Sequence, residues 1–192
     1  MAIAGLTASG LAQAVVPTPG ATEGPFYPGP EMRFDDIDNN LVTIAGRVEQ
    51  AGGEVVRLQG QVLDQQGRPV PGARVEIWQC DVRGRYLHSA DSTASERDGG
   101  FQGFGHDISD QQGRYSFQTI KPVAYSGRTP HIHLKILLAG RQRLTTQLYL
   151  PDHPGNARDW LYQRIPADQR ELVTLRFEAG KDWPLARLNL VI

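Results

Sequence analysis

Residues 56–79 read VRLQGQVLDQQGRPVPGARVEIWQ. Apolar and polar side chains alternate over residues 56–62, which is the pattern of a β-strand with one buried face. Residues 64–72 are rich in Gly, Pro and Asp, which favour turns, and a second strand is expected at 73–79. The stretch therefore predicts two short strands joined by a loop.

The same combination of short strands and turn residues recurs along the rest of the chain. Further strands are expected at residues 113–120, 131–139, 143–150, 171–178 and 185–192. One short helix is expected at 156–162, and residues 89–110 are polar and glycine-rich, as in a long loop near one rim. Seven to eight short strands with long loops and one short helix predict an all-β fold, an antiparallel β-sandwich.

Charge and composition exclude several classes of partner. The chain has 192 residues, with 20 basic and 21 acidic side chains and a formal net charge of -1. No run of Lys or Arg could follow a phosphate backbone, so nucleic acid and anionic membrane surfaces are not expected partners. No segment reaches the apolar length that spans a bilayer, and the chain length suits one domain.

The first residues have two interpretations. Residues 1–14 are small and mostly apolar, and Ala12-Gln13-Ala14 resembles a signal-peptidase site, but a basic start is missing. They are either the remainder of a signal peptide or a small-residue tail. With the expected join at 17–20, residues 1–20 form a flexible N-terminal segment ahead of a domain at 21–192, and the localisation, cytoplasmic or exported, stays open.

Two histidines and two tyrosines are candidate metal ligands. In GRTPHIHLKI, residues 127–136, His131 and His133 lie two apart on an expected strand and share one face. Alone, they fit two partly buried polar side chains equally well. Tyr86 and Tyr125, in loops of similar context, favour a metal, because a phenol ionises at neutral pH only against a strongly acidic, hard cation. Fe(III) is therefore the predicted metal, since zinc more commonly collects cysteines, histidines or carboxylates, and Cys80 is the sole cysteine.

These residues belong to an ordered set of motifs that resembles the intradiol ring-cleavage dioxygenases, the non-haem ferric enzymes of the protocatechuate and catechol dioxygenase kind. The set comprises TEGPFY at 22–27, VEIWQCD at 75–81, GRY at 84–86, GRYSF at 113–117, Tyr125 to His133, and LTTQLY at 144–149. The chain length is nearer to the protocatechuate-type branch. It is too short for a core plus the helical N-terminal dimerisation domain of the catechol-type branch.

The resemblance implies a role for each matching residue. The implied ligands of Fe(III) are Tyr86, Tyr125, His131 and His133. The implied catalytic residues are Arg128, Tyr125 and Gln147, and the implied substrate-binding residues are Arg128, Trp78 and Tyr27. Only two residues separate Tyr125 from Arg128, fewer than in better-known members, so the pocket wall must differ there. The phenols that could be mistaken for Tyr125 are Tyr27, Tyr115, Tyr149 and Tyr162.

The implied activity is intradiol cleavage of a catechol-type diol by dioxygen, giving a cis,cis-muconate-type diacid in aromatic compound catabolism. In this reaction Tyr125 would leave the metal and take up a proton of the diol. The expected partners are a small aromatic diol, dioxygen and further copies of the chain in a homo-oligomer. Catechol, protocatechuate, hydroxyquinol and larger catechols all remain candidate substrates.

Two other classes of protein fit parts of the sequence. A non-catalytic carboxypeptidase-regulatory-like β-sandwich binding module would account for residues 60–73 but not for the tyrosines and histidines. A copper or zinc enzyme would use His131 and His133 with His88 or His106, although both of the latter are expected to be surface residues of the loop. Metal content and colour separate the three classes.

Overall fold

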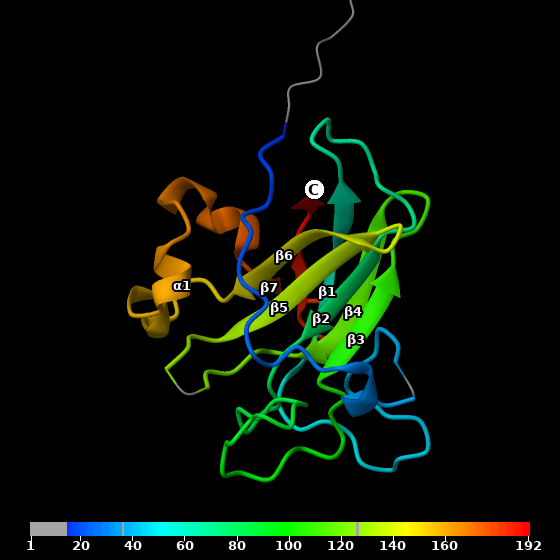
Figure 1. Cartoon of the computed structure of the whole chain (residues 1–192), viewed down its shortest axis with the longest axis vertical. Helices are drawn as coiled ribbons and strands as arrows, with labels where there is room; N and C mark the ends of the chain where they lie inside the picture. Colours follow the sequence, from blue (N-terminus) through cyan, green and yellow to red (C-terminus); the bar gives the residue numbers. More distant parts are fainter. Residues whose placement is uncertain (1–14, 36, 126) are drawn as a thin grey trace, which may run out of the picture.

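The computed structural model describes residues 15–35, 37–125 and 127–192, so the expected leader remnant at 1–14 lies outside the described residues. Nine strands of this part form two sheets that pack face to face (Figure 1). The first sheet has the order β4 (Arg114–Ile120), β1 (Val55–Leu63), β8 (Leu185–Arg187), β7 (Phe177–Glu178), with β9 (Leu190–Val191) also on β1. The second has the order β3 (Phe104–Ile108), β2 (Arg74–Trp78), β5 (His131–Leu138), β6 (Arg141–Tyr149).

The predicted all-β sandwich is confirmed, with one refinement of its topology. Strands β8 and β9 run parallel to β1, whereas the other strand pairs are antiparallel. The apolar faces meet between the sheets, where Leu58 and Phe117 of one sheet join Ile77, Ile132 and Leu134 of the other in one buried cluster. Alternation along the strands therefore produced the core, as expected for a two-layer fold.

Two local predictions were wrong. The expected loop 89–110 contains β3, because Phe104 is buried opposite Trp78, while its neighbours Gly103 and Gly105 hide the alternation. The expected strand 171–178 begins as the end of a 3-10 helix, η3 (Ala167–Val173), and only its last two residues form a strand, β7. Thr174 forms an isolated bridge with Tyr149 of β6, and Val173 and Leu175 are buried as a strand pattern would have them.

The remaining helices are short. They are η1 (Pro30–Met32), η2 (Pro154–Ala157) and α1 (Trp160–Gln163), the last two within or beside the expected helical turn at 156–162. Among the described residues, no helix has both the length and the apolar character needed to cross a membrane.

The N-terminal residues that the structure describes lie along the domain. Backbone N–H groups of Val15, Thr18 and Ala21 donate to Gln65 at 3.1 Å, Val191 at 3.1 Å and Thr145 at 2.7 Å. The expected flexible join at 17–20 is therefore held against the domain by hydrogen bonds. In Figure 1 this segment, drawn in blue, crosses in front of β5 and β6.

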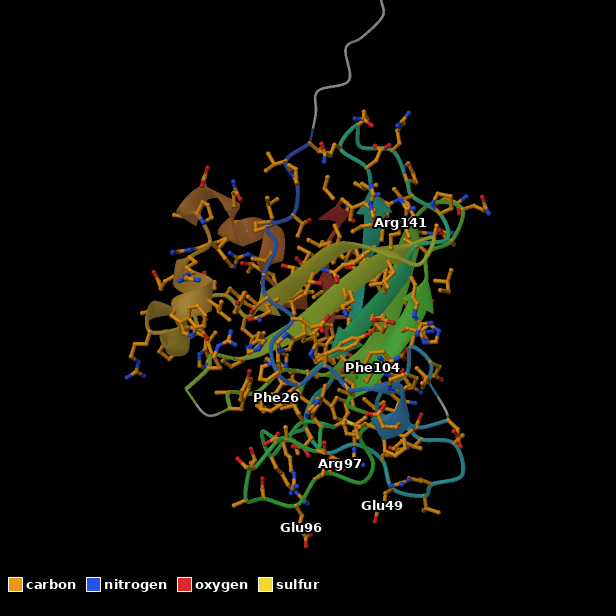
Figure 2. The ribbon with its side chains drawn as sticks, in the orientation of Figure 1. Phe26, Glu49, Glu96, Arg97, Phe104 and Arg141 are labelled. Carbon is orange, nitrogen blue, oxygen red and sulfur yellow. The ribbon has the colours of Figure 1, made fainter. Side chains whose placement is uncertain are left out.

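A second, smaller apolar cluster lies on the outer face of the β3-β2-β5-β6 sheet. Its buried members are Trp78, Cys80, Tyr86 and Phe104, and Phe26 and Tyr27 from the N-terminal segment pack against them. Figure 2 shows Phe26 and Phe104 at one end of this sheet and Arg141 at the other. The candidate ligands lie in this cluster.

Candidate metal centre

Strand β5 presents both histidines to the outer face of the sheet. His131 and His133 are 1% and 2% exposed, while Ile132 and Leu134 between and after them are in the inter-sheet core. The two Nε2 atoms are 3.1 Å apart. The predicted convergence of the two imidazoles is therefore present in the structure.

Both imidazoles are poised to accept a metal ion. His131 Nδ1 lies 2.7 Å from the carbonyl oxygen of Thr129, and because a carbonyl only accepts, Nδ1 carries the hydrogen and Nε2 offers its lone pair. Burial, reinforced by the nearby charge of Arg128, lowers the pKa of His131 to about 4. Burial and the neighbouring His131 hold the pKa of His133 well below its usual value, so both rings are neutral at pH 7.

The two predicted tyrosines complete the group. The hydroxyl of Tyr86 lies 3.1 Å from His133 Nε2, and the ring of Tyr125 lies 5.0 Å from that of Tyr86 and 5.4 Å from that of His131. Burial raises the pKa of both phenols, that of Tyr86 well above its usual range. Each phenol therefore keeps its proton at neutral pH unless a strongly acidic cation displaces it.

The spacing of these atoms fits a single metal ion. Atoms bound to one ion at about 2.0–2.1 Å lie about 3 Å apart when the angle between them is close to 90°, and the two observed separations are each 3.1 Å. No group of three His, Cys, Asp or Glu side chains in the described residues could hold a metal. The third histidine on which the copper or zinc alternative depends, His88 or His106, is therefore not grouped with His131 and His133 in the described residues.

The other candidate histidines and phenols have partners of their own, although the ring of Tyr149 lies 5.8 Å from that of His131. His88 accepts a hydrogen bond from Ala90 within its own loop, and His106 lies in β3 opposite Glu76. The hydroxyl groups of Tyr27, Tyr115 and Tyr149 donate to Glu76, Leu188 and Gln147. Tyr162 packs edge-on against Tyr149 at 5.0 Å. Among these phenols and Tyr125, the last is the one whose ring lies against both Tyr86 and His131.

Trp78 and Tyr27 lie behind His133. The indole of Trp78 stacks on the imidazole with ring centres 4.8 Å apart and planes at 12°, and Tyr27 meets Trp78 edge-on at 5.0 Å. Such packing fixes the orientation of the imidazole. The substrate-binding roles expected for these two residues stay predictions.

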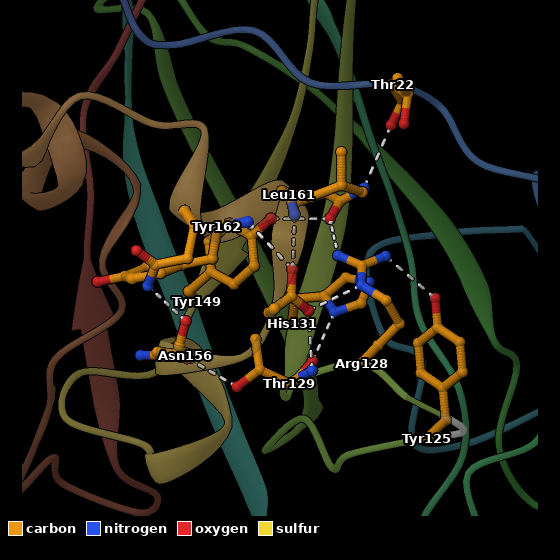
Figure 3. Close-up of polar contacts among 12 residues, drawn as sticks. Thr22, Tyr125, Arg128, Thr129, His131, Tyr149, Asn156, Leu161 and Tyr162 are labelled. Carbon is orange, nitrogen blue, oxygen red and sulfur yellow. Dashed lines mark hydrogen bonds and ion pairs between the residues drawn. The ribbon is translucent and has the colours of Figure 1, made fainter.

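Arg128 and Gln147 lie together beside Tyr125. Arg128 Nη2 donates to Gln147 Oε1 at 2.6 Å, and Nη1 lies 3.5 Å from the Tyr125 hydroxyl (Figure 3). Gln147 is opposite His133 in the β5–β6 register and also donates from Nε2 to the Thr22 carbonyl at 3.2 Å. The permanent positive charge of Arg128 thus lies next to Tyr125, which is more exposed than Tyr86.

Two residues of this site were not singled out from the sequence. Asp159 accepts a hydrogen bond from Arg128 and caps α1, and the available signal was an Asp, a favoured cap residue, inside the helical turn expected at 156–162. Gly24 has φ +77, and a Cβ there would lie 3.4 Å from His133 Cε1. Its place in the TEGPFY motif gave no indication of that approach.

The chain is similar in sequence to dioxygenases over most of its length. The family model described as Dioxygenase matches residues 22–186. The chain is 37% identical to the protocatechuate 3,4-dioxygenase beta chain of Burkholderia cepacia over 150 residues, which cover 73% of this chain and 63% of that one. It is 31% identical to the protocatechuate 3,4-dioxygenase alpha chain of Burkholderia cepacia over 176 residues, which cover 88% of this chain and 87% of that one.

A solved structure extends the similarity to the fold. The dioxygenase domain of a dioxygenase carbohydrate-binding protein fusion from Streptomyces sp. SirexAA-E has a TM-score of 0.70 at 28% identity, covering 92% of this chain and 98% of that one. The chain spans less than two thirds of the length of the Burkholderia cepacia beta chain. Because the family model matches most of the chain and these relatives agree with it, the protein belongs to the intradiol ring-cleavage dioxygenase family.

Proposed function

We propose that the protein binds a non-haem Fe(III) through Tyr86, Tyr125, His131 and His133 and cleaves a catechol-type diol between its two hydroxyl-bearing carbons. The observation that carries the proposal is the buried group of two neutral imidazoles and a phenol with 3.1 Å between neighbouring donor atoms, joined by a second phenol. Enzymes of this family generally depend on non-haem iron, and this donor set suits a hard ferric ion. A binding module would have no use for it.

The bound iron, Tyr125 and Arg128 would each have a separate role in the reaction. When bound, ferric iron would act as a Lewis acid that holds the diolate and draws electron density from its ring. Tyr125 Oη would take up a proton from the diol, because Tyr125 is a more exposed residue than Tyr86 and has Arg128 Nη1 nearby at 3.5 Å. Arg128 would stabilise the negative charge that develops on the ring as dioxygen adds.

The remaining parts of the proposal concern substrate and assembly. Arg128 N donates to Tyr125 O at 2.8 Å, so these two residues of the site are joined by their backbones as well as by the contact of their side chains. Aromatic diols, from catechol to larger catechols, are the proposed substrates, with a cis,cis-muconate-type diacid as the product. The alpha and beta chains among the relatives favour an oligomer, here proposed as a homo-oligomer.

Oxygen uptake tests the proposal. The iron-loaded full chain is mixed with catechol, protocatechuate, hydroxyquinol and a substituted catechol, and the products are identified by mass spectrometry with labelled dioxygen. We expect at least one diol to consume dioxygen and yield a diacid that contains both labelled atoms. Absence of turnover with every diol at full iron occupancy, or cleavage outside the two hydroxyl-bearing carbons, would contradict it.

A further inference from the structure

One buried carboxylate, that of Asp159, joins Arg128 to the first turn of α1. Asp159 Oδ2 accepts hydrogen bonds from Arg128 Nε at 2.8 Å and from the backbone N–H of Thr129 at 3.0 Å. Its Oδ1 accepts from the N–H groups of Leu161 at 3.1 Å and Tyr162 at 3.0 Å. The side chain is 0% exposed. The carboxylate is thus held from both sides and cannot rotate without breaking several bonds.

Two anchors fix the direction of the Arg128 guanidinium. Nε is bound by Asp159, and Nη2 is bound by Gln147 Oε1 at 2.6 Å. Because the guanidinium is rigid and planar, two bound nitrogens determine where the third points. That third nitrogen, Nη1, lies 3.5 Å from the Tyr125 hydroxyl (Figure 3).

Asp159 also supplies the counter-charge that keeps Arg128 in place. The Arg128 side chain is 13% exposed, and a largely buried cation needs an opposite charge with good geometry. Gln147 offers a dipole but no charge. Without Asp159, the guanidinium would gain by turning toward solvent, away from Tyr125.

We infer that Asp159 is a positioning residue that aims Arg128 Nη1 at the site where Tyr125 would meet the diol. The inference rests on the function proposed above and adds a residue to it. Capping of α1 requires only Oδ1, whereas the bond of Oδ2 to Arg128 serves the guanidinium. The turn from η2 to α1 thereby helps to set the geometry of a site whose ligands lie on other elements.

Two substitutions separate the two jobs of Asp159. Asp159→Asn keeps the size of the side chain, but its single carbonyl oxygen cannot both cap α1 and accept from Arg128. Asp159→Ser keeps a good helix cap while removing the charge. Asp110→Asn is the matched control, because Asp110 likewise accepts from two backbone N–H groups, those of Gln112 and Arg114, and from Arg114 Nε at 2.7 Å, in a turn outside the site.

The first measurement is independent of iron and of turnover. In the full chain before iron loading, the Nε–H of Arg128 should give a hydrogen-exchange-protected NMR signal, assigned by its loss in Arg128→Lys. We expect both Asp159 variants to lose this protection and Asp110→Asn to keep it. Retained protection in folded Asp159 variants, or failure of both variants to fold, would overturn the inference.

The second measurement is turnover of the iron-loaded chain. We expect kcat of the Asp159 variants to fall by about ten-fold to a hundred-fold, the usual effect of losing an outer-shell partner, with iron content and KM close to those of the wild type. The double variant Asp159→Asn, Arg128→Lys should be no slower than Arg128→Lys alone, because both changes act on one group. Additive effects would overturn the inference, whereas an inactive wild type would overturn the proposed function and leave the NMR result to decide the role of Asp159.

Discussion

At the scale of single residues, the site depends on how closely uncharged groups approach one another. His133 is enclosed by Trp78 on its face, by His131 and Tyr86 at Nε2, and by Gly24 near Cε1. Its Nδ1 is buried without a hydrogen-bond partner among the described residues. Packing, and not a hydrogen bond to Nδ1, therefore holds the imidazole of His133. Small steric changes around this ring should alter how it binds a metal ion.

Gly24→Ala should disturb the metal centre through His133. The backbone has φ +77, where a Cβ costs about 1 kcal/mol, and the added Cβ would lie 3.4 Å from His133 Cε1. Gly46→Ala is the control, with the same φ of +77 and nothing within 4 Å of the added Cβ. We expect similar losses of unfolding free energy in both variants but weaker iron binding only in Gly24→Ala, measured by chelator competition. Equal iron affinity would show that His133 tolerates the contact.

At the scale of elements, the outer face of strand β5 presents the two histidines and also contacts the N-terminal segment. Its outer face presents His131 and His133 and then, two residues further, Lys135, which pairs with Glu23 and lies 3.5 Å from the ring centre of Tyr27. Glu23 and Tyr27 belong to the N-terminal strap, residues 22–27, which also contributes Phe26, stacked on Tyr86 at 4.8 Å. The strand that carries the histidines therefore also anchors the strap across them.

Lys135→Met should loosen this strap without unfolding the sandwich. The variant keeps the apolar stem but loses the cation–π contact and the ion pair, for an expected loss of about 1–2 kcal/mol. Lys121→Met removes an exposed pair with Glu54, in which both side chains exceed 40% exposure, and should cost about 0.5 kcal/mol or less. Denaturant unfolding gives both values, and faster amide exchange at residues 22–27 should appear only in Lys135→Met. Unchanged exchange there would contradict the anchoring role.

The sequence predicted the parts of the site that depend on local pattern. Alternation along 131–139 was enough to put His131 and His133 on one face, and Tyr86 and Tyr125 were found as phenols in loops of similar context. Asp159 and Gly24 were missed because their partners, Arg128 and His133, lie far along the chain and come together only through tertiary packing. Strand β3 was missed because Gly103 before it and Gly105 within it interrupt the apolar alternation on which the prediction relied.

At the scale of the whole molecule, two apolar clusters on opposite faces of one sheet bury acidic hydroxyl and thiol groups. Burial, and then the charge of Asp81, raises the pKa of Cys80 to about 12. Burial, and then the hydrogen bond to Glu76, raises the pKa of Tyr27 to about 12, and burial alone raises that of Tyr115. In the unfolded chain these groups ionise near their ordinary values of about 8.5 and 10.

Stability should therefore fall in alkaline solution. A raised folded-state pKa contributes stability that is complete below the unfolded-state pKa and is lost as pH rises toward the folded value, here from about pH 9 to 12. Each group adds a slope of up to about 1.4 kcal/mol per pH unit. In Tyr115→Phe, the free energy of unfolding should fall less steeply between pH 10 and 11 than in the wild type, by up to about 1.4 kcal/mol per pH unit. Urea unfolding at the two pH values measures this difference. A slope equal to that of the wild type would show that Tyr115 ionises in the folded state.

The most direct test of the central claim is the iron content and visible absorption of four forms of the chain: wild type, Tyr86→Phe, His131→Ala and the control Tyr115→Phe, whose hydroxyl binds Leu188 outside the site. Tyrosinate-to-Fe(III) charge transfer should colour the wild type and Tyr115→Phe, each with about one iron per chain. Tyr86→Phe should lose or shift the band, and His131→Ala should lose iron. Unchanged iron content and absorption in both Tyr86→Phe and His131→Ala would contradict the assignment of this site as a tyrosinate-bound ferric centre.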